Sequence, residues 1–578
     1  MFKLLKNLRK VDIFMFFIAT CLIFVQVMFD LQLPSYMNKI ITMLTENDNV
    51  VITDIIKIGG IMIGLSIGSI ACSVVVGYFF AKIGANFSKN LRSKFFNKVE
   101  SFSMNEINKF STASLITRTT NDIFQIQGLV TMGMRMLVTA PLMAIWALVK
   151  IINSNSDMSL ITIVCIVLLV TTIFVTFMFA IPRFKKMQKL TDRINLVARE
   201  NLTGLRVVRA YNSEKFQENR VNEVNLTYTK TNFQVGIIMS ALFPIMSIIL
   251  SGLTLFIYWF GASLAGKNLM SIGQIMEFAQ YSTMILTSFS LIAMMFVSLP
   301  RASVSAKRLN EVFDTQNSFV FNDKTTQTPI GQGTVEFKNV SFKYPDAEEY
   351  VLKNISFKAE CGQTVAFIGS TGSGKSTLIN LVPRFYDATE GQVLVNGIDV
   401  KDYSKTDLMD KLGYIPQKGL LFRGTINSNL KYGKSDATPE QIKKSLSIAQ
   451  CSFVSHFKDG LEHNIAQGGT NVSGGQRQRL SIARAFVKDP EIFIFDDSFS
   501  ALDYKTDKKL RERIKKEYIK KTNLIVAQRV GTIIDADQII VLENGEMVGH
   551  GTHEELMNNC VVYQQIANSQ LGNKEVAQ

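Results

Sequence analysis

Six long apolar stretches fill most of the first 300 residues of this 578-residue chain. An apolar segment of about 20 residues is long enough to cross a lipid bilayer as a helix. Since lipid offers no hydrogen-bonding partner, the backbone of such segments must pair internally, which leaves few folds open. Hydrophobic residues make up 47% of the chain and charged residues 19%, as in a membrane protein. We predict six membrane-spanning helices, at residues 12–34, 55–81, 129–152, 158–181, 233–261 and 274–299.

The first apolar stretch follows a basic N-terminus, as the apolar core of a secretory signal peptide does. Lys3, Lys6, Arg9 and Lys10 precede it, but no small-residue cleavage site follows it, and five more apolar stretches do. We therefore expect the first stretch to be retained as a membrane helix.

Positive charge is concentrated in two loops, one between the second and third predicted spans and one between the fourth and fifth. The loop at 36–54 has one Lys against three acidic residues. Because cytoplasmic loops carry the excess of Lys and Arg, the sequence predicts a multi-pass protein of the cell membrane, with a cytosolic N-terminus and everything after residue 300 in the cytosol. We expect the two basic loops to be helices that continue beyond the membrane, with polar turns at 110–122 and 202–211.

The formal net charge of +14 has the same explanation. No nucleic-acid-binding module is recognisable, so a nucleic-acid partner is not predicted. The six cysteines are scattered and form no CxxC pair, and no histidine lies at ligand spacing from them. This pattern is typical of reduced cysteines without disulfides and argues against a zinc site.

Two acidic residues, Asp30 and Glu277, fall at possible membrane depth. Acids inside a membrane are candidates for function. Both also lie near the outer interface, where water would reach them, so contact with a substrate and simple solvation remain alternatives. Methionines are frequent in the spans, and their flexible side chains suit an adaptable binding surface as well as ordinary packing.

The composition changes near residue 313, where a stretch rich in Thr, Gln, Asn and Gly begins. We expect a membrane domain at 1–312, a linker at 313–333, an α/β P-loop domain at 334–570 and a polar tail at 571–578.

A glycine-rich stretch in the second half matches a phosphate-binding loop. The strand-like TVAFIG runs directly into GSTGSGKST, which fits G-x-x-x-x-G-K-[ST] and is followed by an apolar helix pattern. In such a loop the backbone N–H groups surround phosphates, the Lys adds positive charge, and the Ser hydroxyl reaches Mg²⁺. The predicted nucleotide-binding residues are Gly369, Ser370, Thr371, Gly372, Ser373, Gly374, Lys375, Ser376 and Thr377.

Two further glycine- and amide-containing motifs follow this loop. Gln417 comes after a short predicted strand in YIPQKGLLF. The stretch NVSGGQ opens a predicted helix, so its hydroxyl, its N–H groups and the helix dipole could together bind an anion. The residues concerned are Ser473, Gly474, Gly475 and Gln476.

Carboxylates and an aromatic ring complete the set. The apolar strand FIFD ends in Asp496, a candidate Mg²⁺ ligand, and Asp503 ends the motif SALD. Tyr344, in an upstream stretch that alternates like an antiparallel strand, offers a ring on which adenine could stack.

In this order, GSTGSGKST, Gln417, VSGGQ, FIFDD and SALD resemble the ATP-binding cassette. Together with the six spans, TGLRVVRAYNSE and GHGTHEEL, essentially the whole chain resembles a half-size ABC exporter. The resemblance implies that two chains pair and hold two ATP molecules head-to-tail. Each ATP, with Mg²⁺, would lie between the P-loop of one chain and the VSGGQ signature of the other. It further implies that Tyr344, Gln417 and Asp496 act at the nucleotide and its metal.

Three positions depart from the family pattern. The residue after Asp496 is usually Glu, which polarises the attacking water, and here it is Asp497, one methylene shorter. In LIVAQRVGT the family usually has His, which contacts the γ-phosphate, and here it is Gln528. Gln467 stands where a Glu is usual before the signature.

A well-placed base contributes about 10²–10⁴ in rate, and one electrostatic contact about 10²–10³. With Asp497 and Gln528 both changed, we expect this chain's P-loop site to bind MgATP and to hydrolyse it poorly. Because the signature is intact, the prediction is a heterodimer in which this chain completes the competent site of a partner half-transporter. The alternative is a slow homodimer that uses Asp497 as its base.

The resemblance to bacterial multidrug-type exporters implies that amphipathic or drug-like substrates are moved out of the cell, in contact with membrane lipid. A lipid or peptide exporter on the same scaffold and a non-transporting, ATP-sensing regulator remain alternatives. An importer is disfavoured, because spans and cassette are fused in the exporter order.

Overall fold

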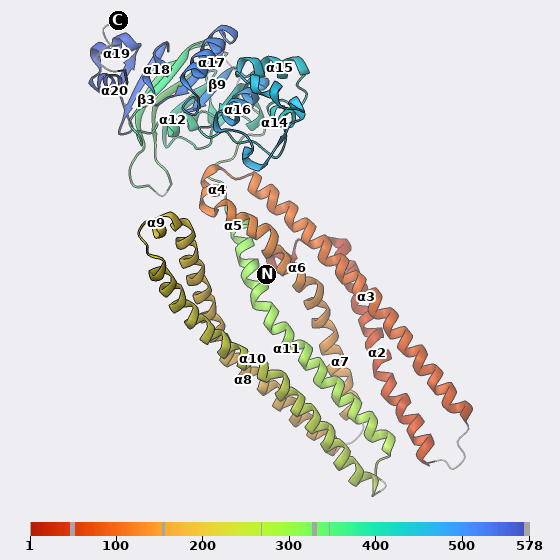
Figure 1. The fold of residues 1–578 in the computed structure, drawn as a ribbon. Coiled ribbons are helices and arrows are strands. Elements are labelled where there is room, and N and C mark those ends of the chain that lie inside the picture. The colour runs from red at the N-terminus through yellow and green to blue at the C-terminus, as the bar shows by residue number, and fades with distance from the viewer. Residues whose placement is uncertain are drawn as a thin grey trace. The chain divides into compact units, whose positions relative to one another are not determined.

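The computed structural model describes residues 2–46, 52–152, 156–267, 269–325, 332–345 and 347–571 (Figure 1). Two compact units make up the chain. Unit 1 comprises Met1–Glu100 and Thr112–Thr315, and unit 2 comprises Ser101–Ser111 and Gln316–Gln578. Part of the expected linker, at 326–331, and most of the expected tail, at 572–578, lie outside the described residues.

Unit 1 consists of long helices. Six of the described helical segments are long and apolar enough to cross a membrane, which confirms the six predicted spans. Several helices continue well past the apolar segment, as expected for the two basic loops; α8 and α10 run side by side over much of their length (Figure 1). The helices are α1 (Phe2–Leu5), α2 (Lys10–Glu46), α3 (Ile52–Glu100), α5 (Thr112–Thr117), η1 (Arg118–Asp122), α6 (Ile123–Gly128), η2 (Leu129–Gly133), α7 (Met134–Ile152), α8 (Ser156–Thr203), α9 (Leu205–Ala210), α10 (Glu214–Ala265) and α11 (Ile272–Asp314).

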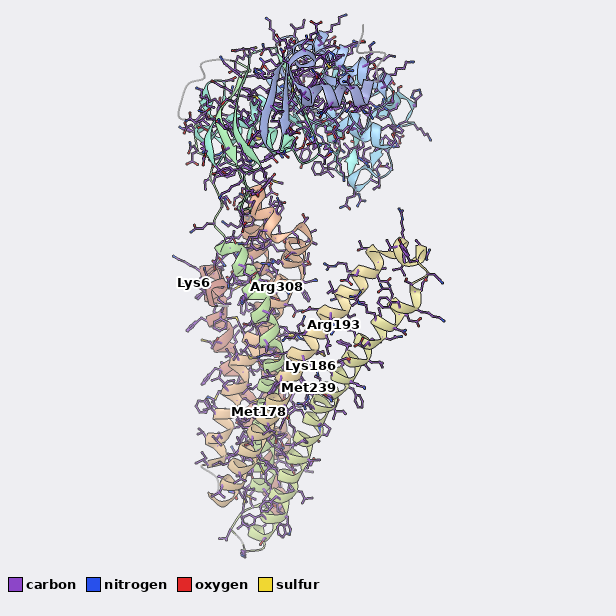
Figure 2. The ribbon with its side chains drawn as sticks, turned by 90° about the vertical axis from the view of Figure 1, so that its left-hand side faces the viewer. Lys6, Met178, Lys186, Arg193, Met239 and Arg308 are labelled. Carbon is purple, nitrogen blue, oxygen red and sulfur yellow. The ribbon has the colours of Figure 1, made fainter. Side chains whose placement is uncertain are left out.

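The helices α8 and α10 form an arm that diverges from the rest of unit 1 towards α9. Figure 2 shows Lys186 and Arg193 on this arm, standing apart from Arg308 of α11. Basic residues of the predicted cytosolic loops are therefore carried on helix rather than on irregular chain.

The polar turn predicted at 110–122 is wrong for most of its length. Only Ser111 interrupts the helices, and α5 leads directly into the π-helical turn η1. The threonines that suggested a turn hydrogen-bond within the helix instead: Thr119 Oγ1 donates to Leu115 O at 2.8 Å and Thr120 Oγ1 to Ile116 O at 2.9 Å. Such bonds let hydroxyl side chains stay in a helix. At 202–211 the break falls at Gly204 and α9 follows it at once.

Unit 2 contains a six-stranded sheet in the order β12-β11-β3-β10-β9-β6 and a four-stranded antiparallel sheet in the order β2-β1-β4-β5. In the larger sheet all strands are parallel except the edge strand β12. The strands are β1 (Val335–Phe342), β2 (Leu352–Ala359), β3 (Thr364–Gly369), β4 (Glu390–Val395), β5 (Ile398–Asp399), β6 (Leu412–Ile415), β7 (Gly424–Thr425), β8 (Asn464–Ile465), β9 (Ile492–Asp496), β10 (Thr522–Val526), β11 (Gln538–Glu543) and β12 (Glu546–Gly551).

The central strands β3, β9 and β10 are almost entirely buried, as expected for parallel strands covered on both faces. Their apolar side chains pack into two cores, one on each side of the large sheet. The helices of unit 2 are α4 (Met104–Phe110), α12 (Lys375–Leu381), α13 (Lys405–Lys411), α14 (Ile426–Lys431), α15 (Pro439–Ile448), α16 (Gly474–Lys488), α17 (Tyr504–Glu517), α18 (Val530–Ile533), α19 (His553–Asn559) and α20 (Val561–Leu571), with short 3-10 turns between them.

The short helix α4 belongs to unit 2 because of its hydrogen bonds. Glu106 is buried and accepts hydrogen bonds from the backbone N–H of Ser103 at 2.9 Å and of Ser318 at 3.1 Å. Asn108 Nδ2 donates to the hydroxyl of Tyr386 at 3.3 Å. Residues 101–111 and the start of the predicted linker are thus joined to one body.

Candidate functional site

Four parallel strands deliver the predicted nucleotide-binding residues to one edge of the large sheet. The P-loop follows β3, Gln417 follows β6, Asp496 ends β9, and Gln528 follows β10. The carboxyl ends of parallel strands meet at the same edge, where α/β proteins bind their ligands. Residues that are far apart in the sequence therefore form one site.

The P-loop is shaped by glycines that no other residue could replace without strain. Gly374 has φ +95° and Gly369 has φ +156°. A Cβ on Gly369 would lie 2.0 Å from the carbonyl oxygen of Leu542, so the loop passes too close to β11 for a side chain. This geometry accounts for two of the glycines in the motif.

Lys375 begins α12 and is 9% exposed. Its Nζ donates to the carbonyl oxygens of Gly369 at 2.9 Å and Ser370 at 2.7 Å, inside the curve of the loop. Burial lowers the pKa of this ammonium group, although the carboxylates of Asp497 and Asp496 act in the opposite direction. The charge is thus held where an incoming phosphate can pair with it.

Ser376 and Asp496 form the centre of a candidate magnesium site. Ser376 Oγ donates to Asp496 Oδ1 at 2.7 Å, and the hydroxyl of Tyr414 donates to Asp496 Oδ2 at 3.3 Å. Burial raises the pKa of Asp496, and the hydrogen bonds from Ser376 and Tyr414 partly offset this. A hydroxyl and a single carboxylate at hydrogen-bond distance fit Mg²⁺, which binds one or two protein oxygens together with nucleotide phosphates and water. Tyr414 was not among the predicted residues.

The two residues that depart from the family pattern contact each other directly. Gln528 Nε2 donates to Asp497 Oδ2 at 2.7 Å, and Gln417 Nε2 donates to the same oxygen at 3.1 Å. Asp497 is 5% exposed and has φ +48°, a left-handed conformation that Asp tolerates better than most residues. One carboxylate oxygen of Asp497 is therefore already occupied by two amide donors.

The signature motif lies at the start of α16. Ser473 caps the helix: its Oγ accepts from the backbone N–H of Gln476 at 3.2 Å. Ser473 and Gly474 are exposed. In the described part of the chain, no hydrogen bond joins the signature to this chain's own P-loop. This is the arrangement expected if the signature faces another molecule.

Gln478, one turn into α16, is a buried residue beside the candidate site that the sequence did not single out. It is 2% exposed, accepts from the backbone N–H of Gly419 at 2.7 Å and donates to Pro416 O at 3.1 Å. The segment around Gln417 is thus clamped to the signature helix. A second Gln two residues after the signature was the only signal in the sequence.

The remaining predicted residues occupy peripheral positions. Tyr344 is half-buried, and its hydroxyl lies 3.1 Å from Thr377 Oγ1, so the ring borders the P-loop. Asp503 caps α17 through the backbone N–H of Thr506 at 2.9 Å, a bond that lowers the pKa of Asp503. Gln467 is exposed in a 3-10 turn before the signature.

Comparison with known proteins decides the family. A model of the ABC transporter transmembrane region matches residues 16–289, and an ABC transporter model matches residues 352–500. An uncharacterized ABC transporter ATP-binding protein of Mycobacterium tuberculosis is 37% identical over 521 residues, 89% of each chain. The chain belongs to the ABC transporter family, as a half-size exporter. Its ATP-binding domain implies an ATPase coupled to transport, and its six apolar helices imply a multi-pass membrane protein.

Other relatives of the exporter extend over most of its length. The Bacillus subtilis protein YfiB, also an uncharacterized ABC transporter ATP-binding protein, is 32% identical over 96% of each chain. A multidrug resistance ABC transporter ATP-binding and permease protein of Lactococcus lactis is 28% identical and covers 88% of this chain and 86% of its own. A solved bacterial Atm1-family ABC exporter with ATP bound shares the fold, with a TM-score of 0.81, 21% identity and coverage of 95% and 98%.

In the membrane-spanning unit of the exporter, both predicted acids are hydrogen-bonded to neutral side chains. Ser69 Oγ donates to Asp30 Oδ1 at 2.6 Å. Glu277 accepts from Ser35 Oγ at 2.5 Å and from Asn38 Nδ2 at 2.6 Å. A third charged residue, Arg135, lies in the predicted span at 129–152 and was missed, although its charge in an apolar stretch was visible in the sequence.

Proposed function

We propose that the exporter's own P-loop site holds MgATP and hydrolyses it slowly, and that its signature completes the competent site of a partner half-transporter. The observation that carries the proposal is the pair of hydrogen bonds from Gln528 and Gln417 to one oxygen of Asp497. Both positions that the family uses to activate water are thereby altered in one local network.

Activation of water requires a carboxylate oxygen that can accept the proton of the attacking water. In this site Asp497 is one methylene shorter than Glu, and its Oδ2 already accepts two amide hydrogens. The amide of Gln528 stays neutral and cannot gain or release a proton as His does. Together these losses lower the rate by at least about 10²–10⁴ relative to a site with both groups.

Nucleotide binding does not depend on these two positions. Lys375 is held inside the loop for the phosphates, and Ser376 with Asp496 would hold the metal. When bound, Mg²⁺ neutralises charge on the phosphate oxygens. The residues of this chain bind and orient the nucleotide, so occupancy is expected to be long-lived.

The exposed signature supports a partner. Ser473 and Gly474 present a hydroxyl and free N–H groups at the start of a 15-residue helix, away from this chain's own P-loop bonds. Such a terminus stabilises an anion. In the proposed heterodimer it meets the γ-phosphate bound to the P-loop of the partner, while the degenerate site remains filled.

The transported substrate is proposed to be amphipathic or drug-like and to leave the cell. The family membership and the similarity to a relative named as a multidrug resistance transporter support this class. The six helices that are long and apolar enough to cross a membrane support a substrate that contacts membrane lipid.

The test is to measure ATP hydrolysis by the purified full-length chain alone and together with its partner half-transporter. The proposal predicts MgATP binding with little turnover by the chain alone and brisk turnover by the pair. Brisk hydrolysis by the chain alone that Asp497→Ala abolishes would contradict the degenerate site.

A further inference from the structure

Arg135 near the start of α7 extends its guanidinium group deep into the membrane-spanning unit. Thr131, one turn earlier, lies against Gly84 of α3, whereas the guanidinium of Arg135 lies beside Gly77 and donates to Ser73 Oγ at 2.9 Å. Residues 58–81 of α3 carry no charge, and Lys82 is the next charged residue. Ser73 lies nine positions before Lys82, about 13.5 Å along the helix.

This direction is opposite to the one that a charged residue near a membrane interface usually takes. Long basic side chains near the ends of spans reach towards the headgroups, where water solvates the charge. Side chains of a helix also tilt towards its N-terminus, which for α7 is the Lys82 end of α3. The π-helical turn η2 lies directly before α7, and the guanidinium group of Arg135 contacts α3.

The partners of Arg135 leave most of its hydrogen-bonding capacity unused. Among the described residues, no acidic side chain lies within 4 Å of its nitrogens, and its hydrogen bond goes to the neutral Ser73. Arg118 and Arg220 by contrast pair with Glu311 at 3.1 Å and with Glu200 at 2.9 Å. Arg135 is half-buried, and its one side-chain hydrogen bond among the described residues uses one of its five N–H donors.

Among the described residues, two buried acceptors on α7 and on the neighbouring helix α2 have no hydrogen-bond partner. They are Thr139 Oγ1, one turn after Arg135, and Gln26 Oε1 on α2. The antiparallel pairing that brings Asp30 to Ser69 puts Gln26, one turn earlier on α2, at the level of Ser73, one turn later on α3. Unsatisfied buried polar groups call for water, an ion or a ligand.

We propose that Arg135, with Ser73, binds the anionic group of an amphipathic ligand inside the membrane-spanning unit. A guanidinium fork matches the oxygens of a carboxylate or a phosphate ester. The ligand's apolar chain would lie along the surrounding apolar helices, and Gln26 and Thr139 would accept hydrogen bonds from its polar part or from water. This site rests on the proposed export of amphipathic substrates and narrows them to those with an anionic group.

The test uses the full-length chain in phosphatidylcholine nanodiscs and three probes of equal chain length: decyl phosphate, decyltrimethylammonium and decyl maltoside. A ligand that binds the folded state raises the unfolding midpoint by mass action. Decyl phosphate is expected to raise it, and Arg135→Gln is expected to weaken the apparent affinity about 10- to 100-fold, as for loss of a hydrogen bond to a charged group. Arg135→Lys should keep part of the effect.

Arg183→Gln is the matched control, because Arg183 at the end of its span donates to the carbonyl of Phe179 at 2.9 Å. It should leave the response to decyl phosphate unchanged. Nanodiscs that contain phosphatidylglycerol distinguish the two sources of the anionic group. If a lipid headgroup binds at Arg135, these nanodiscs raise the unfolding midpoint of the unsubstituted chain but not that of Arg135→Gln. If a free amphiphile binds there, decyl phosphate raises the midpoint equally in phosphatidylcholine and in phosphatidylglycerol.

Equal affinity for decyl phosphate in the unsubstituted chain and in Arg135→Gln would overturn the site. A double-mutant cycle on the unfolding midpoint would also overturn it if Asp30→Asn and Arg135→Gln were fully coupled and decyl phosphate stabilised neither variant. Arg135 would then serve only a water-bridged pair with Asp30. Neither ATP nor a partner enters this assay. A negative result in this assay therefore does not bear on the degenerate ATP site. Fast hydrolysis at that site would likewise not change the binding data for Arg135.

Discussion

Gln528 and Asp497 each depart from the family pattern. A 2.7 Å hydrogen bond from Gln528 Nε2 to Asp497 Oδ2 joins these two positions directly. In the proposed site either change alone would leave one altered group; together, the amide of Gln528 donates to one of the two carboxylate oxygens of the proposed base. The sequence predicted both positions, because they stand at fixed places after two apolar strands. It did not predict that Gln417 joins them, since that contact depends on β6, β9 and β10 lying next to one another.

The pKa of Asp496 gives a prediction for magnesium. Burial raises this pKa above that of an ordinary Asp, so Asp496 becomes neutral, and a weak metal ligand, at a higher pH than usual. MgATP affinity is expected to fall as the pH drops through that raised pKa. Equilibrium binding titrations from neutral to acidic pH measure it, with Asp496→Asn as the reference because ATP itself titrates. If the difference between the two proteins stayed constant with pH, the raised pKa would be wrong.

At the scale of elements, the apolar spans and the P-loop domain were predictable because each leaves a local pattern: a long apolar run, or a strand followed by a glycine-rich turn. The turn predicted at 110–122 failed because threonine is ambiguous between a turn and a helix whose carbonyls accept from its hydroxyl. The sequence could not predict that α4 belongs to unit 2, because Glu106 of α4 is bonded to Ser318, which is more than 200 residues away in the chain.

The hydrogen bonds of Glu106 that attach α4 to unit 2 can be tested by substitution. Burial alone would raise its pKa, but hydrogen bonds from Ser103 and Ser318 outweigh this and lower it. Glu106→Gln removes the charge from these bonds and is expected to cost about 1.5–3 kcal/mol. Faster hydrogen exchange across residues 101–111 at neutral pH would report the loss.

The pH dependence has a definite sign. Because the folded pKa of Glu106 is lowered, its stabilising contribution is complete above the ordinary Glu pKa of about 4.3 and is lost as the pH falls through the lowered value. Glu440→Gln, at an exposed first-turn position of α15, is the control and should leave the exchange of residues 101–111 unchanged. Equal exchange in both variants would contradict the role of Glu106.

At the scale of the whole molecule, the proposed function has one chain supply two unequal halves to two ATP sites: a P-loop with altered catalytic groups and a complete signature. A Cβ on Gly474 would meet no atom within 4 Å, so a side chain there does not disturb this chain's own fold. Any loss of activity from substitution at Gly474 is therefore expected to arise at the nucleotide of the partner.

In the assembled pair, Gly474→Glu is expected to reduce ATP turnover by about 10²–10³, because it puts negative charge where an anion is stabilised. Lys375→Ala, in this chain's own P-loop, should reduce it much less. Steady-state hydrolysis by pairs carrying one substitution at a time measures both effects. The reverse order of severity would assign the productive site to this chain's P-loop and contradict the heterodimer.

The most direct measurement compares the full-length chain with its Asp497→Glu and Gln528→His double variant, recording MgATP binding and turnover on the same samples. We expect similar MgATP binding in both, slow turnover by the unsubstituted chain, and an increase in turnover of at least about 10² in the double variant, because two copies of that variant that pair supply intact signatures to each other's restored sites. Turnover by the unsubstituted chain as fast as that of the double variant would contradict the degenerate site.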